Sequence, residues 1–289
     1  MRITARFFVF LFVCLLTAAL LTPPLMSTDW IAIEPHRVMG RLAQLFILLG
    51  LWPMLVALRL DDRASLGYRP KRAELLRSLV TGWSIGVAIL ILLVVVLLVL
   101  KIRVPDPGVE IWPGFAGKAL QALIGGLLIG VLEETFFRGA LYTAIRRRDG
   151  LRSAVIWSSL LYAALHFMKP SALPAGTALD WAGALSMCLH AVLDLFQWKN
   201  LDSLLALFLV GVFLSLVRER SGHIGWCIGM HAGWVFVIQS TRRLTDGDPA
   251  SPWSFLVGDY DGTIGLLAAA WIGALAWLFW RFSARMRSA

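Results

Sequence analysis

Long apolar stretches constrain the fold of this chain more than any other feature of its sequence. Residues 7–22, 39–58 and 78–100 are three of them, and the third ends in a run of Leu and Val. Helices of about this length cross the ~30 Å apolar core of a bilayer. Because 58% of the residues are hydrophobic and only 16% are charged, we predict an all-α polytopic membrane protein with about eight transmembrane helices. The other five predicted spans are about 118–145, 151–168, 202–217, 223–240 and 263–280.

Basic residues are concentrated in alternate connections between these spans. The formal net charge of +9 would suggest a nucleic-acid partner in a soluble protein, but here membrane topology explains it better. The richest connections are 59–77 and 146–152, which would share one side of the membrane with both termini. The positive-inside rule therefore places both termini in the cytoplasm. We expect a multi-pass protein of a bacterial inner membrane, and we expect no nucleic acid as a partner.

Two segments of the chain leave alternatives open. Residues 7–22 resemble a secretory signal peptide, but Thr22-Pro-Pro-Leu-Met offers no clear small-residue cleavage site, which favours a retained first span. Residues 181–197 are mostly apolar and include His190 and Asp194. They fit a re-entrant or interfacial helix, or a further span.

A G-x-S-x-G pattern at residues 82–86 has the form of a nucleophile elbow. That motif requires a sharp turn from a strand to a helix, whereas this copy lies inside a predicted membrane helix. We therefore assign it no catalytic role.

An acidic pair lies inside the fourth predicted span. Glu133 and Glu134 are neighbours there, and Arg138 follows four residues after Glu134. Consecutive helical residues differ by about 100°, so the two carboxylates cannot share a face. Glu134 and Arg138 are one turn apart and can pair, which leaves Glu133 without that partner. Ionisable groups inside a membrane are costly and mark functional interiors.

Two histidines lie at a depth similar to that of Glu133. Measured at ~1.5 Å per residue from the basic cytoplasmic ends of their helices, Glu133, His166 and His231 lie about 20, 21 and 16 Å deep. Three helices would thus bring one carboxylate and two imidazoles into one layer of the membrane.

Such a trio supports hydrolysis. A shielded carboxylate acts as a general base, one imidazole helps to hold the attacking water, and the second donates a hydrogen bond to the oxyanion. The alternative is that Glu133, His166 and His231 hold a catalytic zinc. The chain has no H-E-x-x-H motif, so we expect no cofactor, with zinc as the open alternative.

These residues resemble the CPBP intramembrane proteases, a family that includes type II CAAX prenyl proteases and bacterial Abi proteins. The resemblance rests on Glu133-Glu134-x-x-x-Arg138, on Tyr162-x-x-x-His166 and on His231 in a late span, and it covers about 118–240. It implies an intramembrane active-site cavity open toward the cytoplasm. It also implies that Glu133 activates water, His166 assists at that water and His231 stabilises the oxyanion. Glu134 and Arg138 would be the supporting pair.

Two positions depart from the family pattern. Tyr162 replaces the usual Phe, which is a mild change that leaves it a supporting residue. Val235 stands where the family usually has Asn or another polar residue four places after the histidine, so a side-chain donor to the oxyanion is missing. Trp234 or Gln239 could supply another group.

The reading that follows is an intramembrane glutamic-type endopeptidase acting on a peptide or protein substrate, with or without a lipid anchor. We divide the chain into a three-span region (1–117), a protease core (118–240) and a polar loop with the final helix (241–289). The first alternative is a non-catalytic Abi-like membrane protein serving bacteriocin self-immunity or scaffolding. The second is a carrier that uses Glu133 as its titrating group.

Overall fold

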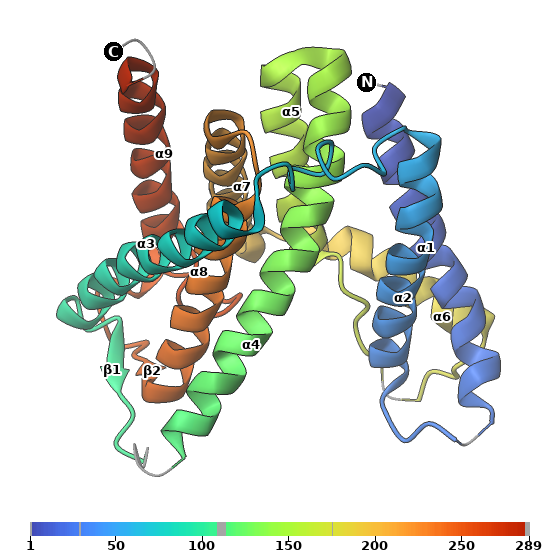
Figure 1. The fold of residues 1–289 in the computed structure, drawn as a ribbon. Helices are drawn as coiled ribbons and strands as arrows, with labels where there is room; N and C mark the ends of the chain where they lie inside the picture. Colours follow the sequence, from blue (N-terminus) through green and yellow to red (C-terminus); the bar gives the residue numbers. More distant parts are fainter. Residues whose placement is uncertain (1, 29, 109–113, 175, 287–289) are drawn as a thin grey trace. The chain divides into compact units, whose positions relative to one another are not determined.

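The computed structural model describes residues 2–28, 30–108, 114–174 and 176–286. Helices make up most of this part of the chain, and one short strand pair accompanies them (Figure 1). The class is therefore nearly all-α, as the sequence predicts. The helices are α1 (Arg2–Met26), α2 (Pro35–Ala57), α3 (Arg72–Val99), α4 (Phe115–Glu134), α5 (Tyr142–Phe167), α6 (Trp181–Leu193), α7 (Leu201–Ser221), α8 (Gly225–Leu244) and α9 (Leu266–Met286).

Shorter elements connect these helices. A π-helix, η1 (Thr135–Leu141), joins α4 to α5. Strands β1 (Arg103–Pro105) and β2 (Thr245–Gly247) pair antiparallel. Three 3-10 turns complete the set: η2 (Asp194–Phe196), η3 (Trp198–Asn200) and η4 (Ser254–Leu256).

The chain forms two compact units that are each discontinuous in sequence. Unit 1 contains residues 1–61 and 163–198, and unit 2 contains residues 62–162 and 199–289. These units cut across the division at residues 117 and 240, which stays a prediction.

In unit 1, α1 packs against both α2 and α6 (Figure 1). Small side chains at these contacts let the helices approach closely. Helix α1 therefore supplies part of the core of unit 1, and its retention stays a prediction. The buried core residues are Leu15, Ala18, Ala19, Met39, Ala43, Ala184, Met187 and Cys188.

Helix α6 answers the question left open for residues 181–197. It begins at an Asp180 N-cap, whose carboxylate accepts a hydrogen bond from the Gly183 backbone N–H at 2.8 Å. It has 13 residues, so at ~1.5 Å per residue it spans about 20 Å, less than the ~30 Å apolar core of a bilayer. A re-entrant or interfacial helix therefore fits better than a further span.

In unit 2, α8 packs between α3 and α4 (Figure 1). Glycines make this close approach possible. A Cβ atom on Gly126 would lie 2.8 Å from the Ala232 carbonyl oxygen, and one on Gly130 would lie 3.0 Å from that of Ile228. Any larger side chain would therefore push α4 away from α8.

The same packing explains the G-x-S-x-G pattern. A Cβ atom on Gly82 would lie 2.7 Å from the Trp226 carbonyl oxygen, and one on Gly86 would lie 2.6 Å from that of Met230. Both glycines lie within α3 and face α8. The pattern is a helix-packing feature, and no strand-to-helix turn is present there.

Six helices in the described part of the chain are long and apolar enough to cross a membrane. One of them, Phe115–Phe167, contains the predicted span 118–145 and all but the last residue of the predicted span 151–168. It is broken at Gly150, whose φ of 85° is not helical, and this is where the sequence predicts the fourth span to exit. The predicted span 223–240 coincides with α8, which is not among the six. The count of eight transmembrane helices stays a prediction.

Candidate active site

The acidic motif lies where α4 changes into a wider helix. Glu134 is the last residue of α4, and the π-helix η1 begins at Thr135. The Thr135 hydroxyl donates to the Val131 carbonyl oxygen and pairs with the Tyr68 hydroxyl, both at 2.6 Å. Segments of π-helix occur frequently at functional sites. No pattern in the sequence indicated this one.

Arg138 in η1 is fully buried at 0% exposure. Its Nη1 donates to Oε1 of Glu134 at 3.1 Å, and its Nη2 donates to the Gly211 carbonyl oxygen on α7 at 3.3 Å. The guanidinium carbon lies 4.5 Å from the centre of the Tyr162 ring, which adds a cation–π contact. The ion pair that the spacing predicts is therefore present, and it ties η1 to α7.

His231 on α8 lies beside both carboxylates. Its Nδ1 is 2.7 Å from Oε1 of Glu134, and its Nε2 is 3.9 Å from Oε2 of Glu133. The imidazole is 5% exposed, so water does not replace these partners. Glu134 thus accepts hydrogen bonds from both Arg138 and His231. The sequence predicted the pair with Arg138 but not the hydrogen bond from His231.

Aromatic rings hold the imidazole in place. The Tyr162 ring meets the His231 ring edge to face, with 6.1 Å between centroids and an interplanar angle of 83°. It meets Phe137 in the same way at 5.1 Å. Tyr162 therefore supports both the arginine and the histidine of this cluster.

Glu133 differs from the other members of the cluster in its access to the outside. Its side chain is 31% exposed, whereas those of Glu134 and Arg138 are at 0%. The two neighbouring carboxylates therefore have different surroundings, as expected for consecutive helical residues. Glu133 is thus partly exposed although its Oε2 atom is buried, and Glu134 is committed to internal hydrogen bonds.

His166 belongs to unit 1, whereas Glu133 and His231 belong to unit 2. It lies near the end of α5, four residues after Tyr162. Its approach to Glu133 stays a prediction from helix depth and family resemblance.

The zinc alternative needs Glu133, His166 and His231 as ligands. The Nδ1 atom of His231 is engaged by Glu134, and only Nε2 faces Glu133. Unit 2 thus offers two donor atoms at this point, one from Glu133 and one from His231. Among the described residues, no group of three or more His, Cys, Asp or Glu side chains is placed to hold a metal ion.

Val235, which lies four residues after His231 where the family usually has a polar side chain, packs against α4. A Cβ atom on Gly126 of α4 would lie 3.5 Å from Cβ of Val235, so Val235 faces α4. The Trp234 ring packs against Phe213 at 6.1 Å in the core of unit 2, and its Nε1 is buried without a hydrogen-bond partner among the described residues.

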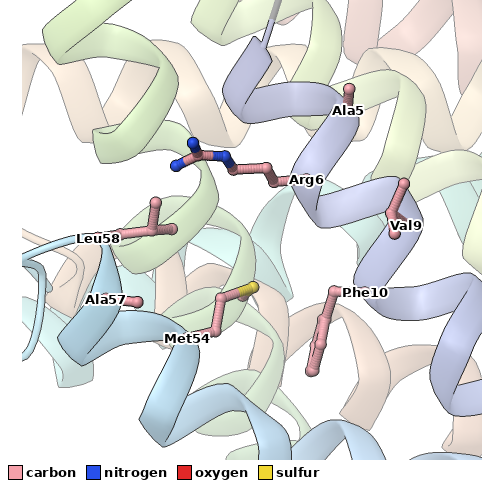
Figure 2. A pocket seen from close by; sticks show the side chains of 7 residues that line it. All are labelled: Ala5, Arg6, Val9, Phe10, Met54, Ala57 and Leu58. Atoms are coloured by element: carbon pink, nitrogen blue, oxygen red, sulfur yellow. The ribbon is translucent and has the colours of Figure 1, made fainter.

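A pocket of about 510 Å³ lies in unit 1, away from these groups in sequence. Figure 2 shows it between α1 and α2, with the Arg6 side chain reaching across from α1 toward Leu58. Its other lining residues are apolar, so it offers no acid or base for hydrolysis. They are Ala5, Val9, Phe10, Met54 and Ala57.

Residues 115–237 match the model of the Rce1-like family, described as type II CAAX prenyl endopeptidase Rce1-like. The match spans less than half of the chain and runs from α4 through η1, α5, α6 and α7 to most of α8. It confirms, for this part of the chain, the resemblance that the motifs indicate. No curated protein and no solved structure matches the chain significantly.

The apolar helices and the family match together define a multi-pass integral membrane protein. At the level of the family, they support a CAAX-protease-like intramembrane endopeptidase.

Proposed function

We propose that this protein hydrolyses a peptide bond inside the membrane with a water molecule activated by Glu133. The observation that carries this proposal is the different environment of the two glutamates. The Glu133 side chain is 31% exposed, and its Oε2 atom lies 3.9 Å from Nε2 of His231. The Glu134 carboxylate is buried between Arg138 and His231.

In this mechanism Glu133 is the general base. It takes a proton from water as the water oxygen attacks the carbonyl carbon of the peptide, and the carbonyl oxygen becomes an oxyanion. When the C–N bond breaks, the same carboxyl group returns the proton to the leaving amine. No metal is needed for this sequence of steps, and we propose none.

His231 stabilises the oxyanion through Nε2. Its Nδ1–H donates to Glu134, and this fixes the ring so that Nε2 faces the reacting groups, as a carboxylate does for the histidine of a catalytic triad. For Nε2 to donate as well, the ring has to be protonated. Arg138 in turn balances the charge of Glu134, so it is a positioning residue in this mechanism.

His166 would assist Glu133 in holding the attacking water. This role rests on its spacing from Tyr162 and on the family resemblance. The substrate would be a membrane-associated peptide or protein, with or without a prenyl group. We place the protein in a bacterial inner membrane with both termini in the cytoplasm, on the basis of charge asymmetry.

The test uses purified full-length protein in liposomes and quenched fluorescent peptides, each made with and without a C-terminal prenylcysteine. We expect cleavage of some of these peptides by the native protein and none by Glu133→Gln. Glu74→Gln is the matched control, since Glu74 is an exposed glutamate on α3 of the same unit.

A second arm compares the membrane proteomes of cells carrying native protein or Glu133→Gln. Equal cleavage by Glu133→Gln would refute the mechanism. Absence of cleavage in both arms would favour the non-catalytic Abi-like alternative.

A further inference from the structure

The pocket of unit 1 takes no part in the proposed hydrolysis, and its lining indicates a ligand of a different kind (Figure 2). Its volume of about 510 Å³ lies within the ~300–1,000 Å³ range of small-molecule sites. All of its lining residues belong to α1, to α2 or to the residue that follows α2, so the pocket is formed within unit 1 alone. A ligand bound here would be independent of the catalytic mechanism.

Small side chains at one end and a large one at the other give the pocket its shape. Ala5 of α1 and Ala57 of α2 line its outer end, and neither side chain is large enough to fill the space between two helices. Phe10 lies deeper and packs on Gly50, where a Cβ atom would lie 2.6 Å from Cε2 of the ring. From Ala5 to Phe10 the pocket follows α1 for about 7.5 Å, at ~1.5 Å per residue. The two helices are therefore in close contact at Phe10 and leave a gap at the two alanines.

Arg6 is the one charged side chain among the lining residues, all of which the structure describes. It is exposed, and Figure 2 shows it reaching across from α1 toward Leu58. In the described part of the chain, its guanidinium takes part in no hydrogen bond or ion pair. A guanidinium binds a phosphate group through two parallel hydrogen bonds. The pocket thus presents an unpaired cation beside an apolar surface.

The location of the pocket along the two spans restricts the ligand further. The candidate span in α1 begins at Thr4, and α2 ends at Ala57. In the predicted topology both of these ends lie at the cytoplasmic surface, where anionic phospholipids give the membrane its negative charge. Deeper along α1 the surface is apolar, and Val13, one turn after the lining residue Val9, is 50% exposed. A ligand here therefore meets headgroups at Arg6 and acyl chains below it.

We propose that this pocket binds an anionic phospholipid from the surrounding membrane. The phosphate accepts hydrogen bonds from the Arg6 guanidinium, and the first methylenes of one acyl chain lie between Val9, Met54 and the alanines at the outer end. The rest of that chain continues along the exposed apolar surface of α1. Charge selects the lipid, because the cationic group of a zwitterionic headgroup is repelled by Arg6 and an anionic headgroup has none. The bound lipid fills the gap between α1 and α2 and so supports their packing in unit 1.

The first experiment measures lipid affinity by native mass spectrometry of the purified full-length protein. The probes are palmitoyl-oleoyl phosphatidylglycerol and the matching phosphatidylcholine. We expect the first phosphatidylglycerol to bind more tightly than the first phosphatidylcholine. Arg6→Gln should lower the phosphatidylglycerol affinity by about five- to tenfold, the loss expected for one basic residue at an anionic surface, and leave that for phosphatidylcholine unchanged.

Arg41→Gln is the matched control, because Arg41 is an exposed arginine toward the other end of α2. Its phosphatidylglycerol affinity should equal that of the native protein. An equal loss in Arg41→Gln, or no loss in Arg6→Gln, would overturn the proposal.

The second experiment locates the lipid. Phosphatidylglycerol with a photoreactive diazirine in its upper acyl chain is placed in nanodiscs with the protein, and crosslinked peptides are identified by mass spectrometry. Crosslinks should be concentrated in residues 5–10 and 54–58. They should be lost in Ala57→Phe, which fills the pocket and leaves the charge of Arg6 in place. Inorganic phosphate at equal concentration should not reduce them, because it has no apolar part.

Three results would contradict a lipid in this pocket. They are crosslinks spread evenly over all spans, crosslinks that persist in Ala57→Phe, and displacement of the lipid by inorganic phosphate. The last would indicate a simple anion site at Arg6.

Discussion

The buried ion pair leads to a sharp prediction about the two neighbouring glutamates. Glu134→Gln keeps the shape of the side chain and removes its charge, which leaves the guanidinium of Arg138 buried without a counter-ion. Both side chains of this pair are at 0% exposure. Glu133→Gln removes a charge from a side chain that is 31% exposed.

The expected size of the difference follows from burial. Breaking a buried ion pair by neutralising one partner costs about 3–5 kcal/mol of folding free energy. For a chain of this size, that corresponds to a drop of roughly 6–20 °C in the thermal midpoint. Glu133→Gln should change the midpoint by only a few degrees, because its side chain is 31% exposed, whereas that of Glu134 is fully buried.

The assay is thermal unfolding of detergent-purified variants, followed by intrinsic tryptophan fluorescence. Glu134→Gln/Arg138→Met should be no less stable than Glu134→Gln alone, because the double change removes the uncompensated charge. Equal loss of stability in Glu133→Gln and Glu134→Gln would refute the division between a structural and a chemical glutamate. A double variant much less stable than Glu134→Gln would show that the charge of Arg138 is not the source of the cost.

Four further predictions can be tested separately. Gly130→Val should lower the thermal midpoint strongly, since its Cβ would lie 3.0 Å from the Ile228 carbonyl oxygen, and a midpoint like that of the native protein would contradict the α4–α8 packing. Burial lowers the pKa of His223, which lies between α7 and α8, so its contribution to stability should be complete above about pH 6.5 and be lost as pH falls below that value. His223→Asn should reduce this acid-dependent loss, measured as the midpoint at pH 7.5 and 5.5. Chelators should leave peptide cleavage unchanged, whereas inhibition reversed by zinc would establish the metal alternative. A reporter fused to the C-terminus should report the cytoplasm, and a periplasmic signal would contradict the eight-span topology.

Features with a local cause could be predicted from the sequence. The ion pair of Glu134 and Arg138 follows from helical spacing alone. The helix break at Gly150 follows from a basic run that ends in a glycine. The multi-pass class follows from apolar length and composition. Each of these requires only neighbours along the chain.

Features that depend on long-range packing could not be predicted in this way. The bond from His231 to Glu134 joins residues 97 positions apart and depends on how α8 lies against α4. The hydrogen bond from Arg103 to the Gly262 carbonyl oxygen joins residues 159 positions apart, and no motif surrounds Arg103. The short length of α6 was also undecided, because its apolar sequence continues into η2. Each of these features depends on which helix faces pack against one another, and the spacing of residues in a single sequence does not specify that packing.

The π-helix η1 has a consequence for how this membrane helix is divided. Its turns are wider than those of the α-helices on either side, so the side chains that follow it are rotated relative to the direction set by α4. Before η1, the helix faces α8 with Gly130 and Glu134. After it, Tyr142 and Arg146 face α7, where both bond to Glu219 at 2.5 and 2.9 Å. The helix thereby exchanges one packing partner for another within seven residues. An insertion or deletion within η1 would turn Tyr142 and Arg146 away from Glu219 and leave the α4–α8 face in register.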